Sequence, residues 1–428
     1  MAVLKVWNNS LGAWVEIGGN PTGLATASGL TVSATSRVLG RKSAGAGAIE
    51  ELTIGTDLLA PSGDGSALTG IPPAQILAGG RLTLESGVSV STTDQTAKTV
   101  VYYTPHVHDQ IGIYTGSVWV ARAFAEISIA LTKVTNGTLT NGAVGVTGIS
   151  STTQLVAGME VTGTGIAGGT TISSVTGATT INLSANATAD GAQSLTFKIP
   201  ASKLVDIYAT WTGAAVELVF GPLWTNTTTR ATAIAQQNGV WVQSGTATRR
   251  LLGTVGTTTT AGQTDDAKGS GATPGSRLVA NVVTVPRPIH ACPAYANDNA
   301  GQSYSVTATT CAAVNGGTNA TASWVVSVVG SITGGARIYA TNPAVVVLIG
   351  GIGIDTTTSI DREGISQPAS GTNSISVPVD LAVGPGLHTA SICAYMSGAG
   401  TATVYADDLR RGHSADPYVT YLSATVGT

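Results

Sequence analysis

Short strand-like runs separated by turn residues recur along much of the chain, and this pattern constrains the fold more than any other feature. The stretch from Thr99 to Phe124 shows it best, because Val, Ile, Tyr and Trp alternate with other residues in two runs, 99–104 and 112–119. Such alternation fits a half-buried pleated surface. Pro105 and the Thr-Gly-Ser sequence at 115–117 are typical of bends. The stretch is therefore predicted to be a β-meander.

The composition favours strands over helices in the remainder of the 428-residue chain. It contains 55 glycines, and only 5% of its residues are aromatic. Glycine disfavours helix and marks tight turns between short strands. Charged residues make up 10% of the chain, with a net charge of −3 and no Lys/Arg run, so a basic surface for nucleic acid is not expected. We expect an all-β, multidomain chain.

The sequence predicts no membrane insertion. The most apolar run, 344–354, is about 11 residues long and is broken by glycines, which is too short to span a bilayer. The first 14 residues, MAVLKVWNNSLGAW, lack a long apolar region followed by a cleavage site. A soluble protein made in a cytoplasm is expected.

The three cysteines, Cys292, Cys311 and Cys393, are odd in number and widely spaced. That spacing fits neither a disulfide framework nor a zinc site. Buried thiols are predicted, and a disulfide between Cys292 and Cys311 is the alternative.

The N-terminal part of the chain divides into two predicted segments. Residues 1–25 are expected to form a hairpin with a turn near 9–12, which would serve for attachment. Residues 26–80 are rich in Gly, Ser and Ala and are expected to be extended. Short apolar pairs favour an interwound stalk whose core forms between chains, and a flexible linker is the alternative. The pairs are Val38-Leu39, Leu58-Leu59 and Ile76-Leu77.

The central part is predicted to be a β-domain, 81–132 and 198–256, that is interrupted by an all-β module at 133–197. The flanking sequences EISIAL and IPASKL would read as one strand-turn-strand if the module were removed, and hairpin loops tolerate such insertions. A polar linker is predicted at 257–277. About nine strand-like segments follow in 278–428, which predict an antiparallel β-sandwich or jelly roll.

Two kinds of residue could carry a metal site or a phosphate site. His106 and His108 form an H-x-H pair on an expected strand or its exit, beside Pro105. Alternation would put both rings on one face, and a trimer could offer six imidazoles to a metal. Two exposed or capping histidines are the favoured interpretation. The glycine-rich segment 163–169 lacks a following Lys-Ser/Thr and fits turns better than a phosphate loop.

Carboxylates occur in two groups, and glycoside hydrolysis requires a pair of them. Each group has arginines beside it in the sequence, which favours solvated, ion-paired loops over catalysis. No catalytic, cofactor-binding or metal residue is therefore assigned. The carboxylates are Asp355, Asp361 and Glu363, near Arg362, and Asp407 and Asp408, near Arg410 and Arg411.

Several segments resemble bacteriophage tail-fibre and other virion-surface fibre proteins. Residues 33–53, SATSRVLGRKSAGAGAIEELT, and 63–71, GDGSALTGI, are similar to their connector segments. The stretch 99–124 and four later ones resemble a phage fibre β-domain in which such strands recur in this order. Part of the interrupting module resembles a small all-β module of phage and bacterial surface proteins. The later stretches are 125–131, 199–211, 223–245 and 248–258, and the module-like piece is 157–188.

The resemblance implies a structural, non-enzymatic virion component that is made in the bacterial host cytoplasm. We expect a homotrimeric tail fibre, attached to other virion proteins through its N-terminal region and presenting a β-sandwich for host adhesion. The alternative is a capsid decoration or head-fibre protein docked on the shell. A polysaccharide-degrading tail spike is a remote alternative, because such spikes resemble long parallel β-helices and this chain shows no regular coil repeat.

Adhesion, if it occurs, is expected to involve host glycans or proteins and weak sites multiplied by copy number. The loops 295–304 and 405–416 are the expected glycan contacts, because Tyr304 and Tyr405 have Asn and Asp neighbours.

Overall fold

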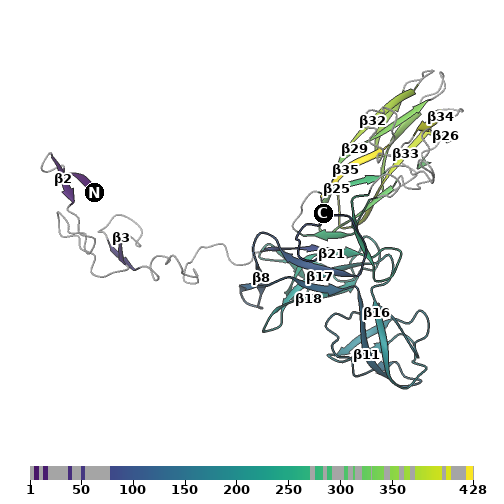
Figure 1. The fold of residues 1–428 in the computed structure, drawn as a ribbon, viewed down its shortest axis with the longest axis horizontal. Coiled ribbons are helices and arrows are strands. Elements are labelled where there is room, and N and C mark those ends of the chain that lie inside the picture. The colour runs from purple at the N-terminus through teal and green to yellow at the C-terminus, as the bar shows by residue number, and fades with distance from the viewer. Residues whose placement is uncertain are drawn as a thin grey trace. The chain divides into compact units, whose positions relative to one another are not determined.

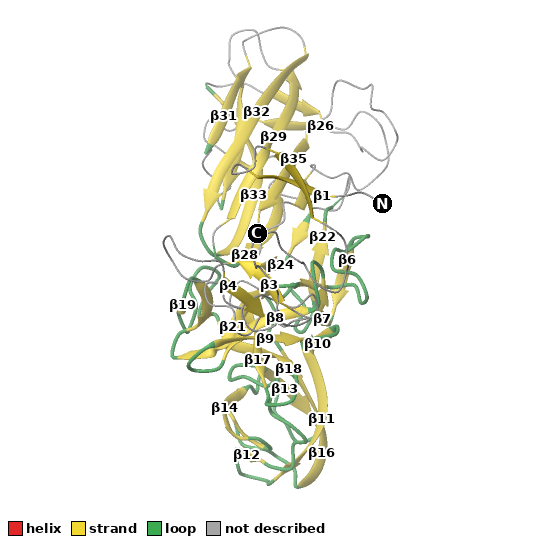
Figure 2. Cartoon of the chain, turned by 90° about the vertical axis from the view of Figure 1, so that its left-hand side faces the viewer, coloured by secondary structure: helices red, strands yellow, loops and turns green. Residues whose placement is uncertain are grey.

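The structure is a computed structural model of residues 1–428, and the part of the chain that it describes contains strands and no helix (Figure 2). The predicted all-β fold class is confirmed. None of the described segments is a helix long and apolar enough to cross a membrane. Two compact units, 1–73 and 74–428, are described separately below. The described residues are 4–8, 13–17, 37–40, 50–53, 78–269, 275–282, 287–291, 303–306, 312–313, 321–328, 330–341, 348–355, 361–366, 372–397, 402–405 and 421–427.

The first unit contains two antiparallel hairpins among its described residues. β1 (Leu4–Asn8) pairs with β2 (Ala13–Ile17), so that Trp7 lies opposite Trp14 in the register. This pairing matches the hairpin predicted for 1–25. β3 (Arg37–Gly40) pairs with β4 (Glu50–Thr53) inside the predicted stalk. The other residues of 26–77 lie outside the described part of the chain.

The second unit begins with two small sheets that together replace the predicted meander. The strands occur where alternation predicts them, but β7 pairs with β5 and β10, whereas β8 pairs with β9. The β8–β9 turn is the predicted one: the Thr115 N–H donates to the Val118 carbonyl at 2.9 Å, and Gly116 has a φ of 100°, which favours glycine. The bounds are β5 Gly80–Thr83, β7 Val100–Pro105, β8 Gln110–Tyr114, β9 Trp119–Ala123 and β10 Ile127–Ala130.

A six-stranded sheet forms the centre of this unit, where β17, β18 and β21 lie side by side (Figure 1). β19 and β20 are joined by Asn238 and Gly239, which both have positive φ, as a tight hairpin turn requires. The Trp119 indole N–H donates to Asn238 Oδ1 at 3.3 Å, so this turn contacts the β8–β9 hairpin. The bounds are β17 Leu204–Trp211, β18 Val216–Leu223, β19 Ile234–Gln237, β20 Val240–Gln243, β21 Thr246–Gly256 and β24 Val279–Asn281.

Residues 132–198 form a module of two three-stranded sheets, β11-β16-β13 and β12-β15-β14. Its first and last residues are neighbours: Thr132 pairs with Lys198, and the Ile199 N–H donates to the Leu131 carbonyl at 3.0 Å. The fully buried Leu131 and Phe197 belong to an apolar core that continues from the host domain into the module. The bounds are β11 Thr132–Leu139, β12 Gly145–Val146, β13 Glu160–Gly163, β14 Ile172–Gly177, β15 Thr180–Leu183 and β16 Gly191–Lys198.

The C-terminal part contains two further sheets, and contacts such as those between β31 and β32 and between β25 and β28 give it a sandwich-like character. The eight-stranded sheet follows the order β31-β30-β33-β28-β23-β22-β6, with β27 on β33, and the six-stranded sheet follows β25-β35-β29-β34-β26, with β32 on β29. Their bounds are β6 Gln95–Lys98, β22 Thr264–Ala267, β23 Ser276–Arg277, β25 Arg287–Ala291, β26 Ser303–Val306, β27 Ala312–Ala313, β28 Thr321–Val326, β29 Gly330–Thr341, β30 Leu348–Ile354, β31 Arg362–Ser366, β32 Thr372–Val383, β33 Gly386–Met396, β34 Ala402–Tyr405 and β35 Tyr421–Gly427.

This sheet order differs from the predicted division at 257–277. The predicted linker contains β22 and β23, where Asp266 and Arg277 form a buried ion pair at 3.1 Å. Polar residues suggested a linker, but mutual pairing allows them to be buried in a sheet. β23 then runs parallel to β28, and β24, at the start of the predicted sandwich, pairs with β21 instead.

A buried polar network joins the central sheet to β28. Arg230 forms a bidentate pair with Asp206 on β17, at 2.7 and 3.1 Å, and its guanidinium lies 4.2 Å from the Trp224 ring centre. The Thr254 hydroxyl on β21 donates to Asp206 at 2.6 Å and contacts the Ser327 hydroxyl, beyond the end of β28, at 3.0 Å. Every charge in this network therefore has a hydrogen-bonded partner.

Excision of the module tests the predicted insertion. Replacing residues 133–197 with Asn-Gly joins Thr132 to Lys198 through a two-residue turn that suits paired strands. The shortened protein is expected to retain its all-β circular dichroism and to melt cooperatively, but at a lower temperature, because excision removes Phe197 from the shared core at a cost of about 3–5 kcal/mol. Loss of cooperative melting would contradict the prediction that 133–197 is an insertion.

Removal of the Arg230 side chain is also expected to destabilise the protein. Arg230→Ala leaves the Asp206 carboxylate buried without its cation, which costs about 3–5 kcal/mol of unfolding free energy. Denaturant titration measures this loss. The double substitution Arg230→Met, Asp206→Leu removes both charges and should recover most of it, and a double variant as unstable as Arg230→Ala would contradict the assigned pairing.

Candidate functional site

The two histidines of the H-x-H pair take part in local contacts. His106 is exposed, and its Nδ1 lies 2.7 Å from the Ser89 hydroxyl. His108 Nδ1 accepts a hydrogen bond from the Gln110 N–H at 3.3 Å. In the described part of the chain, no three His, Cys, Asp or Glu side chains are close enough to hold a metal ion. These contacts suit capping histidines, and metal binding in an oligomer stays a hypothesis.

A carboxylate–imidazole pair lies at one end of β33 in the C-terminal sheets. His388, on β33, is 6% exposed, and its Nδ1 lies 2.7 Å from Asp355 Oδ2. Its Nε2 lies 2.8 Å from the Gly384 carbonyl. Both neighbours only accept hydrogen bonds, so the two contacts together require a proton on each ring nitrogen. The geometry thus favours an imidazolium, which also lies 5.6 Å from the Trp324 ring centre.

The pKa values of the pair move apart in the direction that this geometry requires. Burial is the largest influence on the pKa of His388 and lowers it, but the hydrogen bonds to Asp355 and Gly384, with the charge of Asp355, outweigh burial and raise the pKa above its ordinary value. Burial likewise raises the pKa of Asp355, but hydrogen bonds from His388 and the Thr389 N–H lower it overall. Because Nε2 is occupied by a carbonyl, the pair is suited to holding two turns together rather than to activating a nucleophile.

Among the remaining carboxylate candidates, the side chain of Asp361 is described and has its own backbone contact. Asp361 Oδ2 accepts a hydrogen bond from the Ile354 N–H at 2.6 Å, and Glu363 lies on β31 opposite Gly351. Asp355 thus has His388, not an arginine, as its described ionic partner. Asp407 and Asp408 lie outside the described residues. The sequence analysis missed His388, although a lone histidine beside the apolar run of β33 was a usable signal.

Of the three cysteines, the structure describes Cys393. Cys393 is a buried thiol whose Sγ donates weakly to the Ser391 carbonyl at 3.7 Å. Cys292 and Cys311 lie outside the described residues. The alternative disulfide between them stays a prediction.

The strands next to the two predicted glycan-binding loops, β26 and β34, pair with each other. β26 begins at Ser303, β34 ends at Tyr405, and these residues are opposite each other in the antiparallel register. The chain therefore enters β26 and leaves β34 at one end of the pair. Residues 295–302 and 406–416 lie outside the described part of the chain, so glycan contact there stays a prediction.

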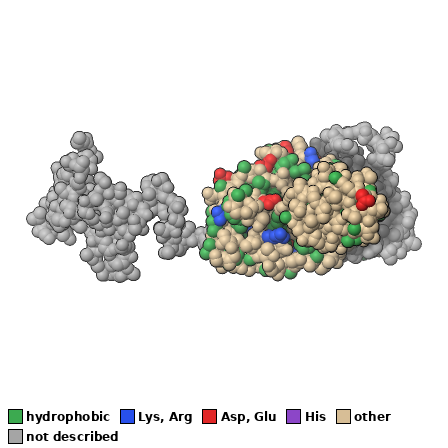
Figure 3. All heavy atoms as spheres, turned by 90° about the horizontal axis from the view of Figure 1, so that it is seen from below, with side chains coloured by type: hydrophobic (Ala, Val, Ile, Leu, Met, Phe, Trp, Pro, Cys, Tyr) green, Lys and Arg blue, Asp and Glu red, His purple; other side chains and the backbone are tan. Residues whose placement is uncertain are grey.

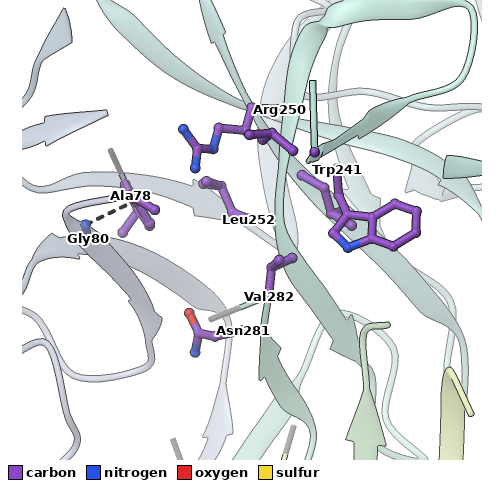
Figure 4. A pocket seen from close by; sticks show the side chains of 11 residues that line it. Ala78, Gly80, Trp241, Arg250, Leu252, Asn281 and Val282 are labelled. Carbon is purple, nitrogen blue, oxygen red and sulfur yellow. Dashed lines mark hydrogen bonds between the residues drawn. The ribbon is translucent and has the colours of Figure 1, made fainter. Parts of the chain in front are cut away.

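A cavity of about 250 Å³ lies between the first small sheets and β21. The amide of Asn281, one of its lining residues, accepts from the Leu82 N–H at 2.7 Å and donates to the Leu82 carbonyl at 3.1 Å. That amide is therefore engaged in joining β24 to β5. Figure 4 shows Ala78, Gly80, Trp241, Arg250, Leu252, Asn281 and Val282 around the cavity.

The other polar groups of this cavity are engaged as well. The Tyr103 hydroxyl accepts from the Gly80 N–H at 3.2 Å, and Arg250 donates to the Gly112 carbonyl at 2.9 Å. Burial raises the pKa of Tyr103 to about 12 and lowers that of Arg250 to about 10, so both keep their ordinary charge at neutral pH. Since its polar groups hold the fold together, we regard the cavity as a structural feature rather than a ligand site.

The protonation of His388 gives a testable pH dependence. Its raised pKa adds stability below the unfolded value of about 6.5, and that contribution is lost as pH rises through the folded pKa. The lowered pKa of Asp355 adds stability that is lost as pH falls through the folded pKa, below about 4. His388→Asn should therefore reduce the melting temperature most near pH 5 and progressively less in alkaline buffer.

The matched control for this measurement is His106→Asn, at an exposed histidine. It should show no comparable maximum near pH 5. Nitrogen-15 NMR of the wild-type ring should report protons on both nitrogens at pH 6, and a neutral tautomer there would refute the imidazolium assignment.

Comparison with known proteins gave no family. No protein-family model matches the chain, and no curated protein matches it. A functional assignment therefore depends on the composition, the fold and the chemistry of the described residues.

Proposed function

We propose that this chain is a structural, non-enzymatic component of a bacteriophage virion: a homotrimeric tail fibre that presents its C-terminal β-sandwich to the host surface. The observation that carries the proposal is the succession of β-modules along one weakly charged chain, one of them closed at its base by the pairing of Thr132 with Lys198. This organisation suits an extended display of binding surfaces better than it suits one enclosed catalytic centre.

The surface chemistry supports a role on the particle exterior rather than on nucleic acid. On the face shown in Figure 3, acidic and basic side chains are few and scattered among uncharged ones. A nucleic-acid-binding face would instead gather Lys and Arg into a patch.

Trimerisation is supported by the first unit. Its described residues form two-stranded hairpins, and an isolated hairpin is marginally stable in water. Neighbouring copies would cover these hairpins and would bury the apolar pairs of the predicted stalk. Association is therefore the expected source of stability for 1–73.

Two measurements test the proposal. Light scattering of the purified protein at micromolar concentration should give three times the 42.7-kDa chain mass, and labelled antibodies should locate the protein on the tail by electron microscopy. A monomer mass would refute the trimer. Antibody label on the capsid shell would favour a capsid decoration protein over a tail fibre. Release of new reducing ends from host polysaccharide would refute the non-enzymatic role.

A further inference from the structure

A second cavity differs from the structural one in having a cation with unused donors. It is a cleft of about 520 Å³ between the module and the central sheet, within the range of about 300–1,000 Å³ that is usual for small-molecule sites. One wall comes from the loop at 152–157 and from β14, and the other comes from β18, β20 and β21. We call it the Arg249 cleft; the lining residues used below are Leu155, Val156, Ser174, Pro222, Gln243 and Arg249.

Arg249 is the charged side chain of this cleft. Its Nη1 donates to Gln243 Oε1 at 3.1 Å, which fixes the guanidinium in place. Among the described residues, no carboxylate forms an ion pair with Arg249, whereas Arg230 and Arg277 are paired with Asp206 and Asp266. The guanidinium is half-buried and is held by a neutral amide. Its positive charge and most of its N–H donors can therefore interact with a ligand.

The other residues that line the cleft indicate which further chemical groups the ligand should have. Ser174 is half-buried and has a hydroxyl, and the Gln243 amide, whose oxygen accepts from Arg249, has an NH₂ group as a further donor. Leu155, Val156 and Pro222 add apolar surface. Hydroxyl and amide groups beside apolar patches suit a ring with many hydroxyls, while a single guanidinium suits a single carboxylate through paired hydrogen bonds.

We propose that the Arg249 cleft binds a carboxylate-bearing sugar residue of a surface glycan. Arg249 binds the carboxylate, Gln243 and Ser174 hydrogen-bond to the ring hydroxyls, and the apolar side chains cover a face of the ring. The inference rests on the proposed role in host adhesion. A weak site suffices there, because several copies on one particle act together.

The module and the central sheet, which form the two walls of the cleft, approach each other closely at Gly158 and Leu223. A Cβ atom at Gly158 of the module would lie 2.9 Å from Leu223 Cδ1 on β18, and Gly158 has a φ of 89°. Glycine therefore allows the module to approach the central sheet closely at this position. A larger residue there would displace one wall of the cleft from the other.

Saturation-transfer NMR on the full chain, with millimolar glucuronic acid as probe, tests the proposal. The wild-type protein should bind glucuronic acid, and Arg249→Gln should weaken binding about tenfold or more, as expected for the loss of charged hydrogen bonds. Lys268→Gln, at an exposed lysine, removes the same charge outside the cleft and should leave binding unchanged. Glucose, which lacks the carboxylate, should bind at least about tenfold more weakly than glucuronic acid.

Four outcomes would overturn the proposal: no binding by the wild type, binding that survives Arg249→Gln, equal losses in both variants, or acetate binding as tightly as glucuronic acid. The last would reduce the cleft to a simple anion site. Virion localisation is measured separately. If the protein is found on virions but does not bind glucuronic acid, only the proposed ligand of the Arg249 cleft is refuted. If it binds glucuronic acid but is absent from virions, only the proposed fibre role is refuted.

Discussion

The buried pair of Asp206 and Arg230 is the interaction on which the arrangement of the second unit depends most. Burying two charges costs several kcal/mol each unless both are paired and hydrogen-bonded. Here Thr254 donates to the carboxylate, and Arg230 donates to the backbone carbonyl of Ser327. The carboxylate is therefore satisfied within the central part, and its two partners, Arg230 and Thr254, in turn contact Ser327, the residue that follows β28. Both charges belong to the central part, and the contacts of Arg230 and Thr254 with Ser327 fix the end of β28 against it.

Local alternation was sufficient to find strands but not their partners. In β7, the alternating Val101 and Tyr103 are buried, as the pattern predicts. The neighbours of β7 are nevertheless β5 and β10, and not the β8 that follows it. Alternation reports which face of a strand is buried, whereas pairing depends on contacts between distant segments. The fold class was therefore predictable from the sequence and the sheet order was not.

Polar strands were missed for a related reason. The sequence of β22, Thr-Asp-Asp-Ala, has the composition of a linker, yet Asp266 is buried because Arg277 pairs with it. The Arg249-Arg250 doublet shows the same limit for the site. Adjacent residues of a strand point to opposite faces, so Arg250 donates to Gly112 on one side while Arg249 enters the cleft on the other. Only the position of the module reveals that the second face is a cleft.

The module contributes to the cleft as well as to the apolar core that it shares with its host domain. It contributes one wall, while the guanidinium and its orienting amide come from β20 and β21 of the central sheet. The paired residues Thr132 and Lys198 belong to the module's own strands β11 and β16, and the flanking strands β10 and β17 lie in two different sheets rather than in the predicted hairpin. A change inside the module can therefore alter the wall while β10 and β17 keep their partners. In such an arrangement the charge that attracts the ligand is fixed by the host domain, and the shape that selects the ligand is set by the module. Variation within the module would then change specificity while the fold that carries Arg249 is kept.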